Sequence, residues 1–315
     1  IAFWMMTRRF LPATSLLNWR CFQVLPWLLK LGAAQSVTRT WSFIVSPTTR
    51  IILAGILGTS MLASYDLGTQ LATITAMVGS MMHPALLPAF SYLTGSEDEV
   101  GFRDFLFRSS KYVVVLGLPF FWFPMIFAEP LIFAWLDRPP ELIALAARIL
   151  LVTSFFNQLT GPSTEALIGA GKPRLPVQKV LMGCVLSVVL PVALGFSLGY
   201  VGFLVGVGLA TAAPAAFFFQ RFRRGAGAGL FQNVGGLFCR MSLALSPLMG
   251  VAYVVYRATQ DSVCWNWLWV WMIMFSFFLG ATFMVYRRTQ VISDAEAARV
   301  YRLVFRRWAK GKSVR

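Results

Sequence analysis

The sequence predicts an all-α polytopic membrane protein, a bundle of about eight transmembrane helices. Of its 315 residues, 57% are hydrophobic and only 13% are charged, and the mean hydropathy is +0.68. A soluble domain of this size carries about a quarter charged residues, so this much apolar surface could not be hidden in one water-soluble core. Lipid is therefore the expected solvent for most of the chain.

The apolar stretches are long enough to be read as individual spans. A spanning helix needs roughly 20 mainly apolar residues, and turn or breaker residues such as Gly199 and the pair Pro139 and Pro140 separate successive stretches. The expected spans cover residues 27–56, 67–90, 112–135, 142–168, 177–197, 201–220, 238–256 and 264–286.

The distribution of Lys and Arg predicts that both termini are cytoplasmic. With the N-terminus inside, 23 of the 28 basic residues fall in cytoplasmic segments, and the outer loops hold only Arg50, Arg138 and Arg257. This bias is typical of membrane proteins and explains the net charge of +16 without a nucleic-acid partner. The chain begins with Ile1, and Ile1–Met6 resembles the end of an apolar span, which indicates an N-terminally truncated fragment.

The first expected span has one polar face. At 100° per residue its polar side chains share an arc of about 120°, and they are Gln35, Thr38, Arg39, Ser42, Ser46, Thr49 and Arg50. Arg39 and Arg50 are about 16 Å apart along the axis, and Pro47 between them could kink the helix. Charges retained inside a bilayer are usually functional. The alternative is that Arg50 reaches the outer interface and the other groups only bond to neighbouring helices.

Two more expected spans show weaker polar faces. Their members are Asp66, Thr69, Gln70, Thr73 and Ser80 in the second, and Ser154, Gln158, Gly161 and Glu165, with Asn157 at the margin, in the fourth. Pro162 is a possible kink in the fourth span. Three helices that each have a polar face predict a shared polar cavity. The candidate substrate-binding residues are Gln35, Arg39, Ser42, Ser46, Arg50, Asp66, Gln70, Asn157, Gln158 and Glu165.

Other signals are more often structural. His83, which precedes Pro84, is expected to be a packed or interfacial residue rather than a proton relay. Gly202, Gly206 and Gly208 are expected to permit close helix contacts.

Two helix starts are predicted at the membrane surface. Ser96 with Glu99 forms a capping-box pattern ahead of the third span, and Ser293 with Glu296 repeats it in the tail. The tail helix would place apolar residues, including Trp308, on one face and basic residues on the other, which suits a helix on an anionic cytoplasmic leaflet. The membrane-surface candidates are Arg299, Arg302, Arg306 and Trp308, and a solvated basic tail is the alternative.

The patterns of enzyme sites are missing from the sequence. It has no Gly-rich phosphate loop, no His or Cys cluster with metal-ligand spacing, and no nucleophile with a plausible base beside it. No catalytic residue, metal or cofactor is therefore expected, and the topology keeps the four cysteines from pairing.

Several short motifs follow one another in a recognisable order. They are Leu28-Leu29-Lys30-Leu31-Gly32, Thr49-Arg50-Ile51-Ile52-Leu53-Ala54-Gly55-Ile56-Leu57-Gly58, Tyr65, Pro88-Ala89-Phe90-Ser91, Phe127-Ala128-Glu129-Pro130-Leu131-Ile132 and Glu165-Ala166-Leu167-Ile168-Gly169-Ala170-Gly171-Lys172-Pro173. Their order resembles the C-terminal half of a polysaccharide flippase of the multidrug/oligosaccharidyl-lipid/polysaccharide (MATE-like) superfamily. The resemblance covers most of residues 24–224.

The resemblance implies a domain organisation. Residues 24–224 would form a six-helix transporter lobe, the second of two, and residues 225–290 would add two further transmembrane helices. Residues 1–23 would be the remnant of a preceding span with a cytoplasmic linker, and residues 291–315 a basic amphipathic cytoplasmic tail.

The resemblance also implies a function in the bacterial inner membrane. An undecaprenyl-pyrophosphate-linked saccharide, destined for lipopolysaccharide O-antigen or exopolysaccharide, would be moved to the outer leaflet by alternating access. The partners would be membrane lipids and polysaccharide polymerase machinery. Two alternatives stay open: a cation-coupled multidrug exporter of the same fold, which favours buried carboxylates, and a membrane-embedded glycosyl- or phosphotransferase, which needs acidic or His residues converging at the surface.

Overall fold

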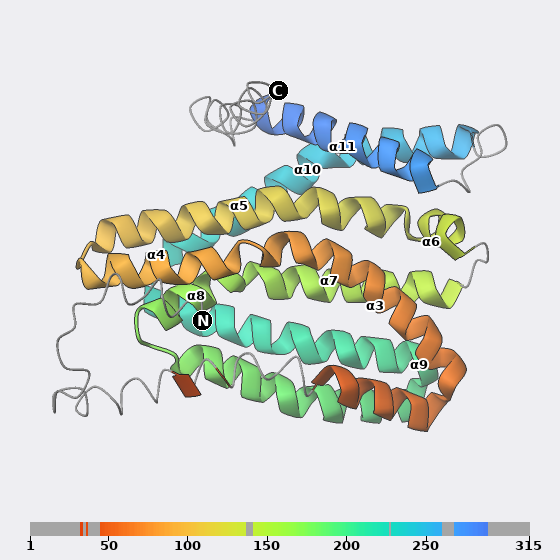
Figure 1. Cartoon of the computed structure of the whole chain (residues 1–315), viewed down its shortest axis with the longest axis horizontal. Coiled ribbons are helices and arrows are strands. Elements are labelled where there is room, and N and C mark those ends of the chain that lie inside the picture. The colour runs from red at the N-terminus through yellow and green to blue at the C-terminus, as the bar shows by residue number, and fades with distance from the viewer. Residues whose placement is uncertain are drawn as a thin grey trace, which may run out of the picture.

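The computed structural model describes residues 45–136, 141–226, 228–259 and 268–288, together with residues 32, 33 and 36. The long helices of this part of the chain lie roughly alongside one another (Figure 1). After a first helix, Val45–Leu57, the order is α3 Thr59–Ser80, α4 His83–Gly95, α5 Glu99–Ile126, α6 Ala128–Leu136, α7 Glu141–Leu159, α8 Gly161–Gly169, α9 Arg174–Ala226, α10 Ala228–Thr259 and α11 Leu268–Arg288.

Several predicted residues fall outside the described part of the chain. They are Gln35, Arg39 and Ser42 of the first polar face, and Arg299, Arg302, Arg306 and Trp308 of the tail.

The described helices have the lengths and the surface of a membrane protein. Three stretches are long and apolar enough to cross a bilayer, Glu99–Ile126, Leu142–Gly169 and Arg174–Arg224, and three shorter apolar helices accompany them. Large apolar side chains lie on the outside of α9, where Phe196 is 73% exposed. Such a surface suits lipid rather than water. The all-α, multi-pass architecture follows, whereas the total of eight spans stays a prediction.

Two expected spans, residues 67–90 and 142–168, are each divided into two helices. The first breaks between α3 and α4, just before His83, and the second breaks at Thr160, between α7 and α8. Pro84 and Pro162 lie in the first turns of α4 and α8. Proline has no N–H to donate and therefore suits a first turn, not a helix interior. The predicted kink at Pro162 is confirmed; the other break was not predicted.

Helix α9 is a hairpin of two close antiparallel legs (Figure 1). Its backbone turns at Gly199, where φ is +65°, a value that glycine adopts without strain. A Cβ on Gly206 would lie 2.7 Å from the carbonyl oxygen of Leu190, and one on Gly202 would overlap that of Leu194. The expectation that these glycines permit close helix contact is confirmed.

The main core lies between α3, α5, α7 and the second leg of α9. Gly68 lets α3 approach α7, since a Cβ there would lie 2.8 Å from Ala146 Cβ, and Tyr65 packs edge-on against Phe203. Helices α10 and α11 cover α5 on the other side (Figure 1). An aromatic cluster joins these three helices and contains Phe123, Phe127, Met249, Trp271 and Phe278.

The predicted capping box at the start of α5 is wrong. Asp98, not Ser96, is the N-cap, and its carboxylate accepts a hydrogen bond from the N–H of Gly101 at 2.8 Å. The backbone of Glu97 has a φ of +55°, so the chain turns between α4 and α5. Ser96 lies before that turn and donates to the carbonyl of Leu93 at the end of α4. Asp is as good an N-cap as Ser, and the turn decides which one reaches the helix.

Candidate functional site

Arg50 and Asp66 form an ion pair across the turn between the Val45–Leu57 helix and α3. Arg50 Nε donates to Asp66 Oδ1 at 2.8 Å, and the two side chains are 47% and 32% exposed. The turn lies at Gly58, whose φ is +85°. Ser46 and Gln70, from the same two polar faces, are exposed. The structure thus joins the two polar faces that the sequence predicted separately.

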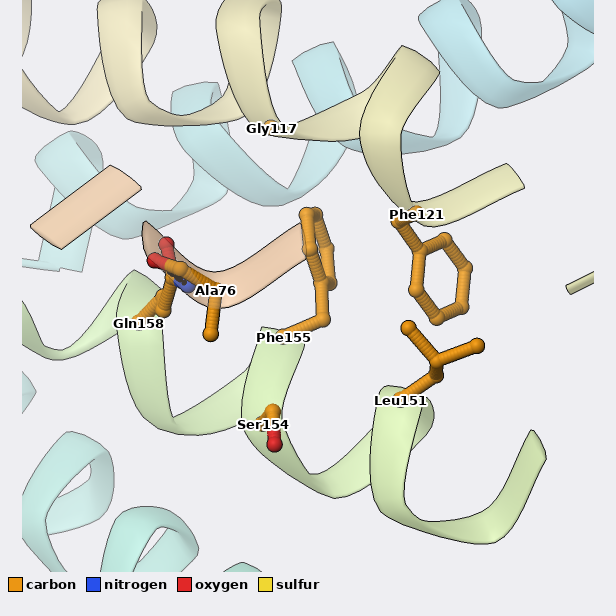
Figure 2. Close-up of a pocket in the computed structure, with 7 residues that line it drawn as sticks. All are labelled: Ala76, Gly117, Phe121, Leu151, Ser154, Phe155 and Gln158. Atoms are coloured by element: carbon orange, nitrogen blue, oxygen red, sulfur yellow. Dashed lines mark hydrogen bonds between the residues drawn. The ribbon is translucent and has the colours of Figure 1, made fainter. Parts of the chain in front are cut away.

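Gln158 and Ser154 line a small crevice between α3, α5 and α7. Figure 2 shows its lining, which is Ala76, Gly117, Phe121, Leu151, Ser154, Phe155 and Gln158. The crevice has about 10 Å³, roughly the room that one water needs. Gln158 Nε2 donates to the carbonyl of Ala76, and the rings of Phe121 and Phe155 stack 4.7 Å apart. Gln158 therefore ties the end of α7 to the end of α3.

A larger cavity of about 280 Å³, with both polar and apolar residues in its lining, lies where the two divided helices are interrupted. It is bounded by the start of α4, the end of α7, α8 and both legs of α9. Its lining is His83, Asn157, Thr160, Gly161, Thr164, Glu165, Ile168, Pro176, Lys179, Val180, Gly183, Ala210, Thr211 and Pro214. Two predicted site residues, Asn157 and Glu165, are among them.

Lys179 brings a positive charge to this cavity. Its Nζ donates to Thr160 Oγ1 and lies 5.6 Å from the ring centre of Phe218. Thr160 in turn donates to the carbonyl of Asn157 at 2.6 Å. The sequence analysis counted Lys179 only as a cytoplasmic basic residue and missed this position. A signal was present, because Lys179 is the only charged residue between Arg174 and Arg221.

His83, the first residue of α4, also lines the cavity. Its Nε2 is buried and has no hydrogen-bond partner among the described residues. The ring packs against Gly161, where even a Cβ would overlap it. Residue 161 must therefore be glycine for α4 and α8 to meet as they do. The expected packing of His83 is observed, and the same side chain also faces the cavity.

The comparisons with known proteins agree with this architecture. The MatE family profile matches residues 33–193, just over half of the chain. The chain belongs to the MatE family. No curated protein and no solved structure matches it. Proteins of the MatE family are membrane transporters, not enzymes. The matched residues include the Arg50–Asp66 pair, both helix breaks and Lys179.

Within the described part of this MatE protein, the predicted site residues lie in three places instead of one cavity. The Arg50–Asp66 pair is near the start of α3, the Gln158 crevice is near its end, and Asn157 and Glu165 line the cavity beyond the break. Asp66 precedes the end of α3 by about 21 Å at 1.5 Å per residue. Helix periodicity shows which face a residue occupies, but it does not show at what depth that face meets another helix.

Proposed function

We propose that this chain is part of a transporter that moves a lipid-linked oligosaccharide from the cytoplasmic to the outer leaflet of a bacterial inner membrane, for the synthesis of cell-surface polysaccharide. The observation that supports the proposal is a lysine-bearing cavity at the paired breaks of neighbouring helices; both breaks and Lys179 lie within the MatE-matched residues. In other transporters, interrupted helices frame substrate sites because their ends expose backbone groups and they can move as separate halves.

The charges of the chain suit an undecaprenyl-pyrophosphate-linked saccharide. Arg50 and Lys179 are cations on different helices of the transporter lobe, and Arg39 lies upstream on the first predicted polar face. Guanidinium and ammonium groups bind phosphate oxygens through charge-assisted hydrogen bonds. The polar faces would contact the sugars, while the polyprenyl tail stays in the bilayer. The substrate contacts proposed outside the cavity remain Gln35, Ser42, Ser46, Asp66, Gln70 and Gln158.

A cation-coupled multidrug exporter is the second candidate, because Glu165 places a carboxylate on the cavity wall. Such an exporter binds its coupling ion with buried carboxylates. Expression of the complete protein in a drug-sensitive host separates the two functions. Drug resistance without any effect on surface polysaccharide would favour the exporter, as would a coding region with no glycosyltransferase genes beside it.

Saccharide export by the complete protein tests the flippase. Arg39→Ala and Arg50→Ala should each reduce export, about tenfold for the loss of one charge-assisted phosphate contact. Surface polysaccharide would be measured in a strain that lacks its own flippase. Arg174→Ala, at the exposed start of α9, is the matched control and should export normally. Normal export by both Arg39→Ala and Arg50→Ala would contradict a mechanism that depends on these cations.

A further inference from the structure

We propose that the cavity between α4, α8 and α9 binds the sugar-phosphate portion of the substrate. The phosphate would lie between Lys179 and His83, and the hydroxyls of one sugar would face Asn157 and Glu165. This assignment rests on the proposed function, which it sharpens by naming the binding site and the part of the substrate held there.

The charge at Lys179 favours an anion. The ammonium is placed against a hydroxyl and an aromatic ring, Thr160 and Phe218. Neither group carries an opposite charge, and a half-buried charge loses part of its hydration until an opposite charge balances it. An ammonium has three N–H donors, and Thr160 accepts only one of them. Phosphate oxygens would accept the other donors in charge-assisted hydrogen bonds.

His83 is a further polar group on the cavity wall. Its Nε2 is buried without a hydrogen-bond partner in the described part of the chain, and a buried ring nitrogen of this kind needs a partner. Because Nε2 is packed against Gly161, the imidazole ring must turn toward the cavity before Nε2 can meet a ligand oxygen.

The size and the remaining polar groups suit one sugar attached to that phosphate. The volume, about 280 Å³, is near the lower end of the range for small-molecule sites, roughly 300–1,000 Å³. A whole oligosaccharide would not fit, whereas a single sugar phosphate would. Asn157 offers a donor and an acceptor for sugar hydroxyls. The hydroxyls of Thr164 and Thr211 already donate to backbone carbonyls, so they can only accept from a sugar. The carboxylate of Glu165 would repel a second phosphate and would accept a hydrogen bond from a sugar hydroxyl. It would therefore orient the sugar toward itself and the phosphate away from itself.

Binding of glucose 1-phosphate to the complete protein in phosphatidylcholine nanodiscs tests this assignment. Lys179→Met removes the charge at similar length and should weaken binding at least about tenfold, whereas Lys179→Arg should stay within a few-fold. Lys172→Met is the matched control, because Lys172 is exposed and outside the cavity, and it should bind like the unmodified protein. Unchanged affinity in Lys179→Met overturns the assignment.

A second pair of variants keeps the test informative if Lys179→Met does not fold. His83→Gln retains an N–H donor near Nε2 and should bind more tightly than His83→Leu, which has none. Equal affinities in these two variants overturn the role of His83. Inorganic phosphate is a second ligand to test. If it binds as tightly as glucose 1-phosphate, the sugar part of the assignment is overturned and the cavity is a simple phosphate site.

The site and the flippase can fail separately. Lys179-dependent binding together with normal saccharide export in Lys179→Met would support the site and refute its use in flipping. Loss of export in Arg39→Ala and Arg50→Ala, without glucose 1-phosphate binding to the unmodified protein, would overturn the site and leave the flippase standing. Undecaprenyl diphosphate in the nanodiscs should compete with glucose 1-phosphate if the site takes the lipid-linked substrate.

Discussion

Two cations of the MatE-matched region, Arg50 and Lys179, differ in what surrounds them. Arg50 has a carboxylate at 2.8 Å and is about half exposed. Lys179 lies in a cavity at the breaks of two helices, against a hydroxyl and an aromatic ring. The charge of Arg50 is balanced by that carboxylate, although the guanidinium keeps further N–H donors that can bind a phosphate. Neither of the two contacts of Lys179 carries an opposite charge.

The comparison shows that a charge on a helix of a membrane transporter does not by itself mark a binding group. What matters is whether the protein has already balanced that charge. The Arg50–Asp66 pair links the Val45–Leu57 helix to α3 and could equally serve to hold the turn at Gly58. The cavity, in contrast, leaves polar atoms on several helices pointing at a common space.

The largest expected change in the free energy of unfolding comes from adding one methyl group at the cavity. In Gly161→Ala the new Cβ would overlap the ring of His83. Overpacking of this kind costs about 1–3 kcal/mol, and it should also displace His83 and weaken glucose 1-phosphate binding.

The matched control for Gly161→Ala lies in the same helix as Arg50. Gly55 is helical and has no atom within 4 Å of an added Cβ. Gly55→Ala should be neutral or stabilise the protein by up to about 1 kcal/mol. Thermal unfolding in detergent measures both variants, and equal melting temperatures would show that the contact between α4 and α8 is looser than described.

A smaller effect is expected from the bond that ties α7 to α3. Gln158→Leu keeps most of the volume but removes the donor to the Ala76 carbonyl. The net loss should be about 0.5–1.5 kcal/mol. Gln178→Leu, an exposed glutamine on α9, is the control and should leave the free energy of unfolding unchanged. If Gln158→Leu unfolds at the same temperature as the parent, the bond does not hold the two helix ends together.

The smallest effect is expected for the Arg50–Asp66 pair. A double-mutant cycle with Arg50→Ala and Asp66→Ala should give a coupling of about 0.2–1 kcal/mol, because both side chains are partly exposed. Unfolding of the four proteins in detergent provides the measurement. A coupling above about 3 kcal/mol would mean that the pair behaves as a buried one, and the contrast with Lys179 would then lose its basis.

Much of the fold was predictable from local sequence. Apolar length predicted the long helices, Pro162 predicted the division between α7 and α8, and the spacing of Gly202 and Gly206 predicted a close contact. These features depend on one segment and its own backbone chemistry. The capping error at Ser96 has the opposite cause, since the turn at Glu97 determines which of several acceptable residues reaches the helix.

The candidate site was predictable only in part. Asn157 and Glu165 were recognised because they share a polar helix face, and Arg50 and Asp66 because charged residues are rare in apolar spans. Lys179 was not recognised, since it was counted with the cytoplasmic basic residues, and His83 was expected to be a packed or interfacial residue. Their shared cavity joins residues that are far apart in the chain.

By itself, the sequence determined that the chain is helical, that most of it suits lipid, and which residues lie on the polar face of each helix, because these properties follow from composition and from a repeat of 3.6 residues. Only the tertiary structure decided that the breaks before His83 and at Thr160 lie beside one another and that Lys179 reaches them. The physical reason is that contacts between distant segments depend on the depth at which helices pack, which the pattern along one helix does not contain.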